Sequence, residues 1–300
     1  MFGSHFLTLA DVTAQQVAQI LETAQELKAK TKRGEAQPLL NGKTLIMIFE
    51  KPSNRTRVSF EVGMLQLGGN AVILRPDEIQ MGKRESIADV AKVLSRYGDG
   101  VMMRVVRHTD IVEFARYATV PVINGLSDLF HPCQAVSDML TIAEHKGRLE
   151  ELTLCYIGDG NNVCNSLIYL AQRTGMRMVV SCPEGYEPTV RTTVAPYEII
   201  NDPEAAVVGA DVLYTDVWTS MGQEDQVLKR LRAFEGYTVT EALLKRAAKD
   251  AIFMHCLPAH RGEEVDDSVM DSPQSVVFDQ AENRLHAQKA ILALLLHNAG

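Results

Sequence analysis

The sequence has 300 residues, of which 46% are hydrophobic and 23% are charged, a balance typical of globular proteins. This length predicts two domains, each large enough to bury its own core. The formal net charge is -8, which excludes a chain-wide positive field that would attract nucleic acid or an anionic membrane surface. An anionic ligand must therefore be bound by a local cluster of positive side chains.

Five cysteines are scattered along the chain, and no two of them have CxxC spacing. The odd number and the spacing predict reduced thiols rather than a disulfide framework or a zinc site. The longest apolar run, 290–296, is far too short to span a bilayer, and the first residues lack the features of a signal peptide. We therefore expect a cytoplasmic protein with no metal, no membrane partner and no nucleic-acid partner.

Short apolar segments alternate with helical patterns along the whole chain. The first helix is predicted to begin near Thr13, which has capping-box spacing to Gln16. In the first half, strands are predicted at 44–49, 71–74, 100–103 and 120–123, and helices through Phe60 to Gly68, at 87–94, at 110–117 and from His131 to about Lys146. In the second half, strands are predicted at 152–157, 177–181, 211–215, 251–255 and 275–278, and helices up to Gly175 and at 282–296.

This alternation predicts an α/β fold with two domains, each a mainly parallel sheet covered by helices on both faces. In such open sheets, ligands bind at the carboxyl ends of the strands. The polar residues that follow each predicted strand are therefore the candidates for a functional site.

In the first half, Ser53–Arg57 follows the first strand and opens a helix. A helix N-terminus favours an anion and arginine offers a bidentate fork, so this segment suits a phosphate. The alternative is a plain capping serine followed by solvated arginines. Arg104 ends the third strand, and His131 and Gln134 begin the helix after the fourth. An arginine and a histidine at neighbouring strand ends could stabilise an oxyanion, although a histidine there is more often a cap or a core residue.

In the second half, Gly158–Val163 lies between a strand and a helix and resembles a dinucleotide fingerprint. Val163 stands where the third glycine is required, and no acidic residue closes the next strand. This pattern argues against a nicotinamide-dependent dehydrogenase. The amide side chains of the segment better suit a small polar ligand.

Two further strand ends supply reactive side chains. Asp216 is placed to hold an amine, unless it is an ordinary turn residue. Cys256 ends another strand and would need a partner to be reactive. Asp216, on a candidate neighbouring strand, is such a partner.

Five motifs occur in one order along almost the whole chain: Ser53–Arg57, His131–Gln134, Asp216–Gly222, His255–Pro258 and Phe278–Arg284. Together they resemble the aspartate/ornithine carbamoyltransferase family, and most of all its ornithine-specific members. The resemblance implies transfer of a carbamoyl group from carbamoyl phosphate to the δ-amine of L-ornithine, giving L-citrulline and phosphate in arginine biosynthesis. It implies no cofactor.

The resemblance also implies a division of the chain and an assembly. Residues 1–140 would form the carbamoyl-phosphate-binding domain, joined by the C-terminal helix 283–300, and residues 141–282 the ornithine-binding domain, with a cleft between them. The protein would be a homotrimer or a multiple of trimers, because Gln80 lies in a loop that reaches the neighbouring subunit's site.

Roles follow from the resemblance by position. The residues implied in catalysis are Arg104, His131, Asp216 and Cys256. Carbamoyl phosphate would be bound by Ser53, Asn54, Arg55, Thr56, Gln80, Arg104, His131, Gln134, Cys256, Leu257 and Arg284. Ornithine would be bound by Asn162, Asp216, Ser220 and Met221.

The chain departs from the family pattern at a few positions. Asn54 stands where the family usually has threonine, Arg84 where some relatives have lysine, and the segment 184–203 is short. The alternatives are a sister carbamoyltransferase that uses aspartate, putrescine or an acylated ornithine, and a catalytically inactive relative. The sequence His255-Cys256-Leu257-Pro258 argues against aspartate, whose relatives resemble His-Pro-Leu-Pro.

Overall fold

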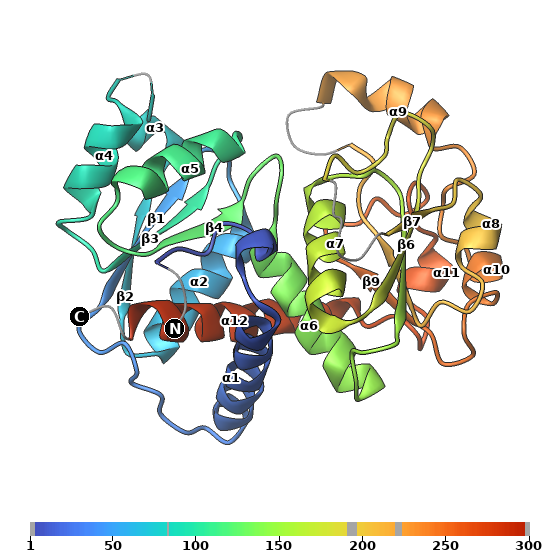
Figure 1. The fold of residues 1–300 in the computed structure, drawn as a ribbon, viewed down its shortest axis with the longest axis horizontal. Coiled ribbons are helices and arrows are strands. Elements are labelled where there is room, and N and C mark those ends of the chain that lie inside the picture. Colours follow the sequence, from blue (N-terminus) through green and yellow to red (C-terminus); the bar gives the residue numbers. More distant parts are fainter. Residues whose placement is uncertain (1–3, 83, 191–196, 220–223, 298–300) are drawn as a thin grey trace. The chain divides into compact units, whose positions relative to one another are not determined.

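The computed structural model describes residues 4–82, 84–190, 197–219 and 224–297 (Figure 1). The chain divides into two compact units, the first formed by Met1–Ser137 with Asn283–Gly300 and the second by Asp138–Glu282. The divisions fall within two helices, α6 (Pro132–Lys146) and α12 (Val277–Leu296). No helix in the described ranges is long and apolar enough to cross a membrane.

The first unit contains a four-stranded sheet in the order β2-β1-β3-β4, and every pairing in it is parallel. Its strands are β1 (Thr44–Phe49), β2 (Asn70–Leu74), β3 (Gly100–Arg104) and β4 (Val122–Leu126). Its helices are η1 (Leu9–Asp11), α1 (Ala14–Lys32), α2 (Asn54–Gln66), α3 (Pro76–Ile79), α4 (Ile87–Leu94) and α5 (His108–Tyr117).

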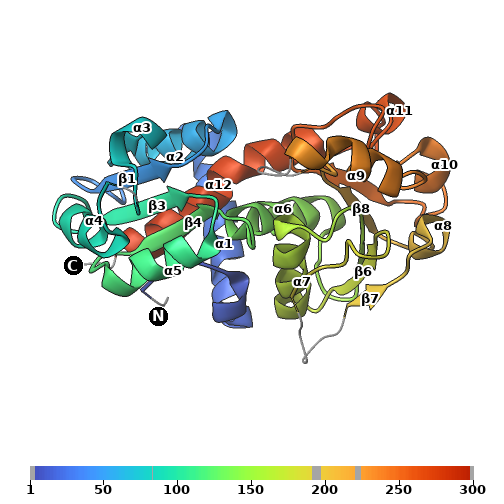
Figure 2. The same ribbon diagram turned by 90° about the horizontal axis from the view of Figure 1, so that it is seen from above.

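Successive side chains of this sheet point to opposite faces and enter two apolar layers. Ile46, Ile48 and Val101 share one cluster with apolar residues of α4 and α5. Figure 2 shows α4 and α5 on one side of the sheet and α2 on the other. The two central strands, β1 and β3, are buried on both faces, which explains why they are apolar along almost their whole length.

The second unit contains a five-stranded sheet in the order β7-β6-β5-β8-β9, again with parallel pairings throughout. Its strands are β5 (Thr153–Ile157), β6 (Arg177–Ser181), β7 (Glu198–Ile199), β8 (Val212–Thr215) and β9 (Ile252–His255). Its helices are α7 (Asn162–Thr174), α8 (Pro203–Ala206), η2 (Glu224–Gln226), α9 (Val227–Ala233), α10 (Glu241–Leu244) and α11 (Asp267–Met270). Cys155, Leu213 and Phe253 pack in one core with residues of α8, α10 and α11.

The predicted fold class is confirmed, and so is the capping box, in which Thr13 and Gln16 exchange hydrogen bonds at the start of α1. The predicted strand at 275–278 is wrong. Ser275 forms only an isolated bridge to Phe253, and Val277 already begins α12. The run of Ser and Val there has strand-like composition, but the two valines are buried where the last helix starts.

Candidate active site

The helix that follows β1 begins without a side-chain cap. Ser53 occupies the N-cap position in an extended conformation, and its side chain makes no capping hydrogen bond. The first N–H groups of a helix have no partner within the helix, so this end of α2 can receive an anion. The alternative of a plain capping serine is therefore not what the structure shows.

Thr56 lies in the first turn of α2, and its buried hydroxyl joins two arginines. Oγ1 accepts a hydrogen bond from Nη1 of Arg104, the last residue of β3, at 3.3 Å. It also accepts one from Nη2 of Arg284, in α12, at 2.9 Å. A single hydroxyl thus holds two guanidinium groups together at the carboxyl end of the first sheet.

His131 lies in the same positive environment and is buried, with 4% of its surface exposed. Its pKa is well below the usual value, first because of burial and then because of Arg284, Arg104 and Arg55. At neutral pH the imidazole is therefore uncharged and can donate one hydrogen bond. Gln134, one turn further along α6, is also buried. The first unit thus gathers three guanidinium groups around a neutral histidine, an arrangement suited to a phosphate and an adjoining carbonyl oxygen.

In the second unit, Asp216 follows β8 and Cys256 follows β9. These strands are neighbours, with Thr215 opposite His255. Sγ of Cys256 donates to Oδ1 of Asp216 at 3.0 Å. The contact expected between the two strand ends is therefore present.

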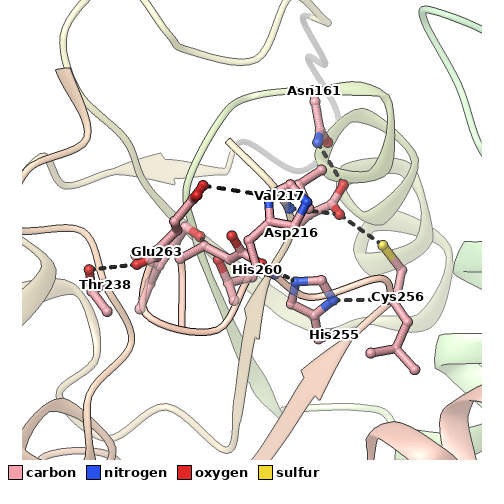
Figure 3. A network of polar contacts seen from close by, with 12 residues as sticks. Asn161, Asp216, Val217, Thr238, His255, Cys256, His260 and Glu263 are labelled. Carbon is pink, nitrogen blue, oxygen red and sulfur yellow. Dashed lines mark hydrogen bonds and ion pairs between the residues drawn. The ribbon is translucent and has the colours of Figure 1, made fainter. Parts of the chain in front are cut away.

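The other oxygen of Asp216 is held by a residue that the sequence analysis missed. Nδ2 of Asn161 donates to Oδ2 of Asp216 at 2.8 Å, and Figure 3 shows the carboxylate between Asn161 and Cys256. Asn161 is also the N-cap of α7, where its Oδ1 accepts from two backbone N–H groups. The sequence feature that could have indicated Asn161 is the Asn-Asn pair after Gly-Asp-Gly. This pattern does not tell which of the two asparagines faces Asp216 at the end of β8. Asn162, the predicted residue, begins α7 and is half-buried.

A buried histidine and glutamate shape the turn that contains Cys256. The N–H of Leu257 donates to Nδ1 of His255 at 2.8 Å, so the proton of neutral His255 is on Nε2. That nitrogen lies 3.1 Å from Oε1 of Glu264. Leu257 has a φ of 57°, a conformation that is strained for this residue type. Glu264 is a second residue that sequence alone did not indicate, because nothing distinguishes it from the adjacent Glu263.

Asp216, His255 and Cys256 offer three ligand atoms within 4.8 Å of one another. Both ring nitrogens of His255 already have partners within the protein. A metal ion bound by this group would therefore have to break one of these contacts. No metal was predicted from the sequence.

The Gly-Asp-Gly turn is closed to a dinucleotide. A Cβ atom at Gly160 would lie 2.2 Å from the backbone nitrogen of Pro188, and the N–H of Gly160 donates to the carbonyl of Tyr186 at 2.8 Å. The segment 186–188 therefore covers the glycine that a pyrophosphate would need to approach.

Other predicted site residues are placed differently. Gln80 is exposed at the end of α3 with a φ of 40°. Asn54 is exposed, whereas Arg55 and Leu257 are half-buried. Ser220 and Met221 lie outside the described residues.

The chain forms two α/β units, each built on a parallel sheet. One unit carries an arginine-rich anion site, and the other carries an Asp–Cys pair. These features define a two-domain α/β enzyme that binds an anion and a second polar substrate. The family description "Aspartate/ornithine carbamoyltransferase, carbamoyl-P binding domain" matches residues 4–144. The description "Aspartate/ornithine carbamoyltransferase, Asp/Orn binding domain" matches residues 150–295. The chain belongs to the aspartate/ornithine carbamoyltransferase family, as the five motifs predicted.

Individual relatives are similar over nearly the whole length. An ornithine carbamoyltransferase of Archaeoglobus fulgidus is 55% identical, with 97% of each chain covered. The anabolic ornithine carbamoyltransferase of Pyrococcus furiosus is 53% identical over 98% of this chain and 96% of its own length. Among solved structures, ornithine carbamoyltransferase from Pyrococcus furiosus has a TM-score of 0.95 at 52% identity, covering 99% of this chain and 98% of that one.

Proposed function

We propose that this protein transfers the carbamoyl group of carbamoyl phosphate to the δ-amine of L-ornithine, giving L-citrulline and phosphate for arginine biosynthesis. The observation that supports this most is the contact between Cys256 and Asp216. It places a thiol and a carboxylate together at the end of a sheet in the unit whose family description is Asp/Orn binding.

The donor substrate would be bound in the first unit. Ser53, Asn54, Arg55 and Thr56 would hold the phosphate at the start of α2, with Gln134 and Arg284 completing the binding set of this unit. Arg104 and the neutral His131 would donate to the carbamoyl oxygen, on which negative charge develops as the amine adds. Loss of one such donor typically raises the barrier by about 3 kcal/mol.

The acceptor would be bound in the second unit, with Asn161, Asn162 and Asp216 as its polar contacts and Ser220 and Met221 from the following segment. The neutral amine attacks the carbamoyl carbon, a C–N bond forms, and the C–O bond to phosphate breaks. We assign the amine proton to the Asp216–Cys256 pair, in which Asp216 is the acceptor. Asp216 would also orient the amine, since Asn161 and Cys256 fix both of its oxygens.

We also propose a homotrimer, or a multiple of trimers, in which the exposed turn at Gln80 contributes to a neighbouring subunit's site. Val58 and Leu65 of α2 and Val72 of β2 support an interface, because these apolar side chains are 54%, 73% and 48% exposed. Light scattering should give a mass that is a multiple of three chains, and a monomer at working concentration would contradict the assembly.

The experiment for the reaction is an assay with carbamoyl phosphate and a panel of amines. L-ornithine, putrescine, L-aspartate and N-acetyl-L-ornithine are each added, and released phosphate and the carbamoylated product are measured. We expect citrulline from ornithine and at least 100-fold lower rates with the other amines, since a site built for polar groups rejects analogues that lack them by roughly this factor or more. A faster rate with putrescine would assign the protein to the sister activity instead.

A further inference from the structure

Helix α12 begins with a buried glutamine that the proposed reaction does not use. Oε1 of Gln280 accepts a hydrogen bond from the backbone N–H of His255 at 2.9 Å. Its Nε2 donates to Oδ1 of Asp138, in α6, at 2.7 Å. One side chain therefore joins α6 to the end of β9, one residue before Cys256.

Tyr214 extends this contact to the neighbouring strand. Its hydroxyl donates to Oδ2 of Asp138 at 3.1 Å and accepts from Nε2 of Gln280 at 3.0 Å. Burial raises the pKa of Tyr214 well above its usual value, so the hydroxyl keeps its proton and remains a donor. Tyr214 precedes Asp216 by two residues in β8. The three side chains thus join both strands that present the reactive pair.

All three side chains are almost completely buried, at 0% exposure for Asp138 and Tyr214 and 1% for Gln280. A buried carboxylate requires donors, because it has lost its hydration, and here Tyr214 and Gln280 each supply one. Buried polar networks that are satisfied in this way hold one arrangement of the chain. The 3.0 Å contact between Cys256 and Asp216 lies at the strand ends that this arrangement fixes.

We propose that Gln280 is a positioning residue for the transfer reaction, which holds the end of β9 so that the thiol of Cys256 meets Asp216. Asp138 acts through Gln280 and fixes the orientation of its amide. The role of Cys256 in the reaction rests on the proposed function. The positioning of its sulfur by Gln280 does not depend on that function.

The test compares Gln280→Met with Gln274→Met. Gln274 lies in the same unit and donates to the carbonyl of Ala251, at the opposite end of β9, so its variant loses a similar bond away from the site. The first readout is the rate at which iodoacetamide alkylates Cys256, with Cys256→Ser as the background. The label is selective, because the other four cysteines are buried. We expect Gln280→Met to change this rate at least fivefold and Gln274→Met to leave it within twofold.

The second readout is steady-state kinetics with carbamoyl phosphate and ornithine. Gln280→Met should lower kcat about tenfold while the KM for carbamoyl phosphate stays within twofold, a split that general destabilisation does not produce. Asp138→Asn keeps the volume, is the variant to use if Gln280→Met does not fold, and should change both readouts in the same direction. The proposal is overturned if Gln280→Met and Asp138→Asn both have the same alkylation rate and the same kcat as Gln274→Met. An inactive wild-type protein would instead contradict the proposed function, and the alkylation rates would still decide the role of Gln280.

Discussion

Thr56 shows how one small side chain can organise two charged ones. Its hydroxyl is the shared acceptor of Arg104 and Arg284, and it is completely buried. A hydrogen bond to a charged group contributes about 1.5–3 kcal/mol, and a buried donor left without its partner costs a comparable amount. The orientation of both guanidinium groups is therefore sensitive to this single oxygen.

We predict that Thr56→Val lowers kcat/KM for carbamoyl phosphate by roughly 10- to 100-fold, which corresponds to the loss of about 1.5–3 kcal/mol. Valine has the same shape but no acceptor. Thr56→Ser is the control, because it keeps the hydroxyl, and its kcat/KM should remain within about threefold of the wild type by the same reasoning. If the valine and serine variants lose the same activity, the methyl group rather than the hydroxyl matters.

At the scale of elements, a buried ion pair joins the turn before α7 to the segment after β8 and to α9. Nη1 of Arg230 donates to Oδ2 of Asp159 and to the carbonyl of Trp218, each at 2.8 Å. Burial raises the pKa of Asp159 to about 6, although Arg230 acts in the opposite direction. The attraction thus does not fully offset the desolvation, and such pairs contribute little net stability. Such a pair does constrain the elements that it connects. In this protein one of them is the turn before α7, close to Asn161 and Asn162.

We predict that Arg230→Met raises the KM for ornithine about tenfold, equivalent to about 1.4 kcal/mol, with the KM for carbamoyl phosphate unchanged. The emission of Trp218, the one tryptophan of the sequence, should shift to longer wavelength as its packing on Phe234 loosens. Lys146→Met, which removes another enclosed cation of this unit paired with Asp250, should leave the emission and the KM for ornithine unchanged. An unaltered emission in Arg230→Met would show that the ion pair does not hold this segment.

At the scale of the whole molecule, stability at alkaline pH depends on a lysine enclosed by three helices of the first unit. Lys289 of α12 is 0% exposed, and its Nζ donates to Thr31 of α1 and Gln66 of α2, each at 2.9 Å. Burial lowers the pKa of Lys289 from 10.5 to about 8. Between these two values the unfolded chain binds more protons than the folded one, so the free energy of unfolding contributed by this group rises with pH. Below pH 8, Lys289 is protonated in both the folded and the unfolded state, so folding carries the full free-energy cost of burying its charge.

We predict that Lys289→Met removes this rise. Denaturant unfolding at pH 7.5, 8.5 and 9.5 gives the free energy of unfolding of both proteins. The wild-type value minus the variant value cancels the other titrating groups, and it should increase as the pH rises. Lys28→Met, which alters a buried lysine bonded to Asn283, is the control and should retain the rise. A constant difference between wild type and Lys289→Met across this range would contradict the lowered pKa.

The sequence by itself determined the fold class and the strand ends at which the chemistry lies. Alternation of apolar strands and helices is a local property, since each segment must match the period of its own element and bury its own apolar face. The motifs after β1, β3, β8 and β9 were found for the same reason. The family resemblance, confirmed by the comparisons, then supplied the substrates that these local patterns could not specify.

Only the tertiary structure decided which side chains meet. Thr56 and Arg284 are 228 positions apart, and no local pattern predicts that they share a hydrogen bond. Which asparagine contacts Asp216 depends on the direction in which the start of α7 points. Gln280 lies between the predicted strand 275–278 and the predicted helix 282–296, whereas the structure places it in α12. Such contacts depend on the packing of elements distant in sequence, because a hydrogen bond requires positions within a few tenths of an ångström, whereas a hydrophobic pattern specifies only which face of an element is buried.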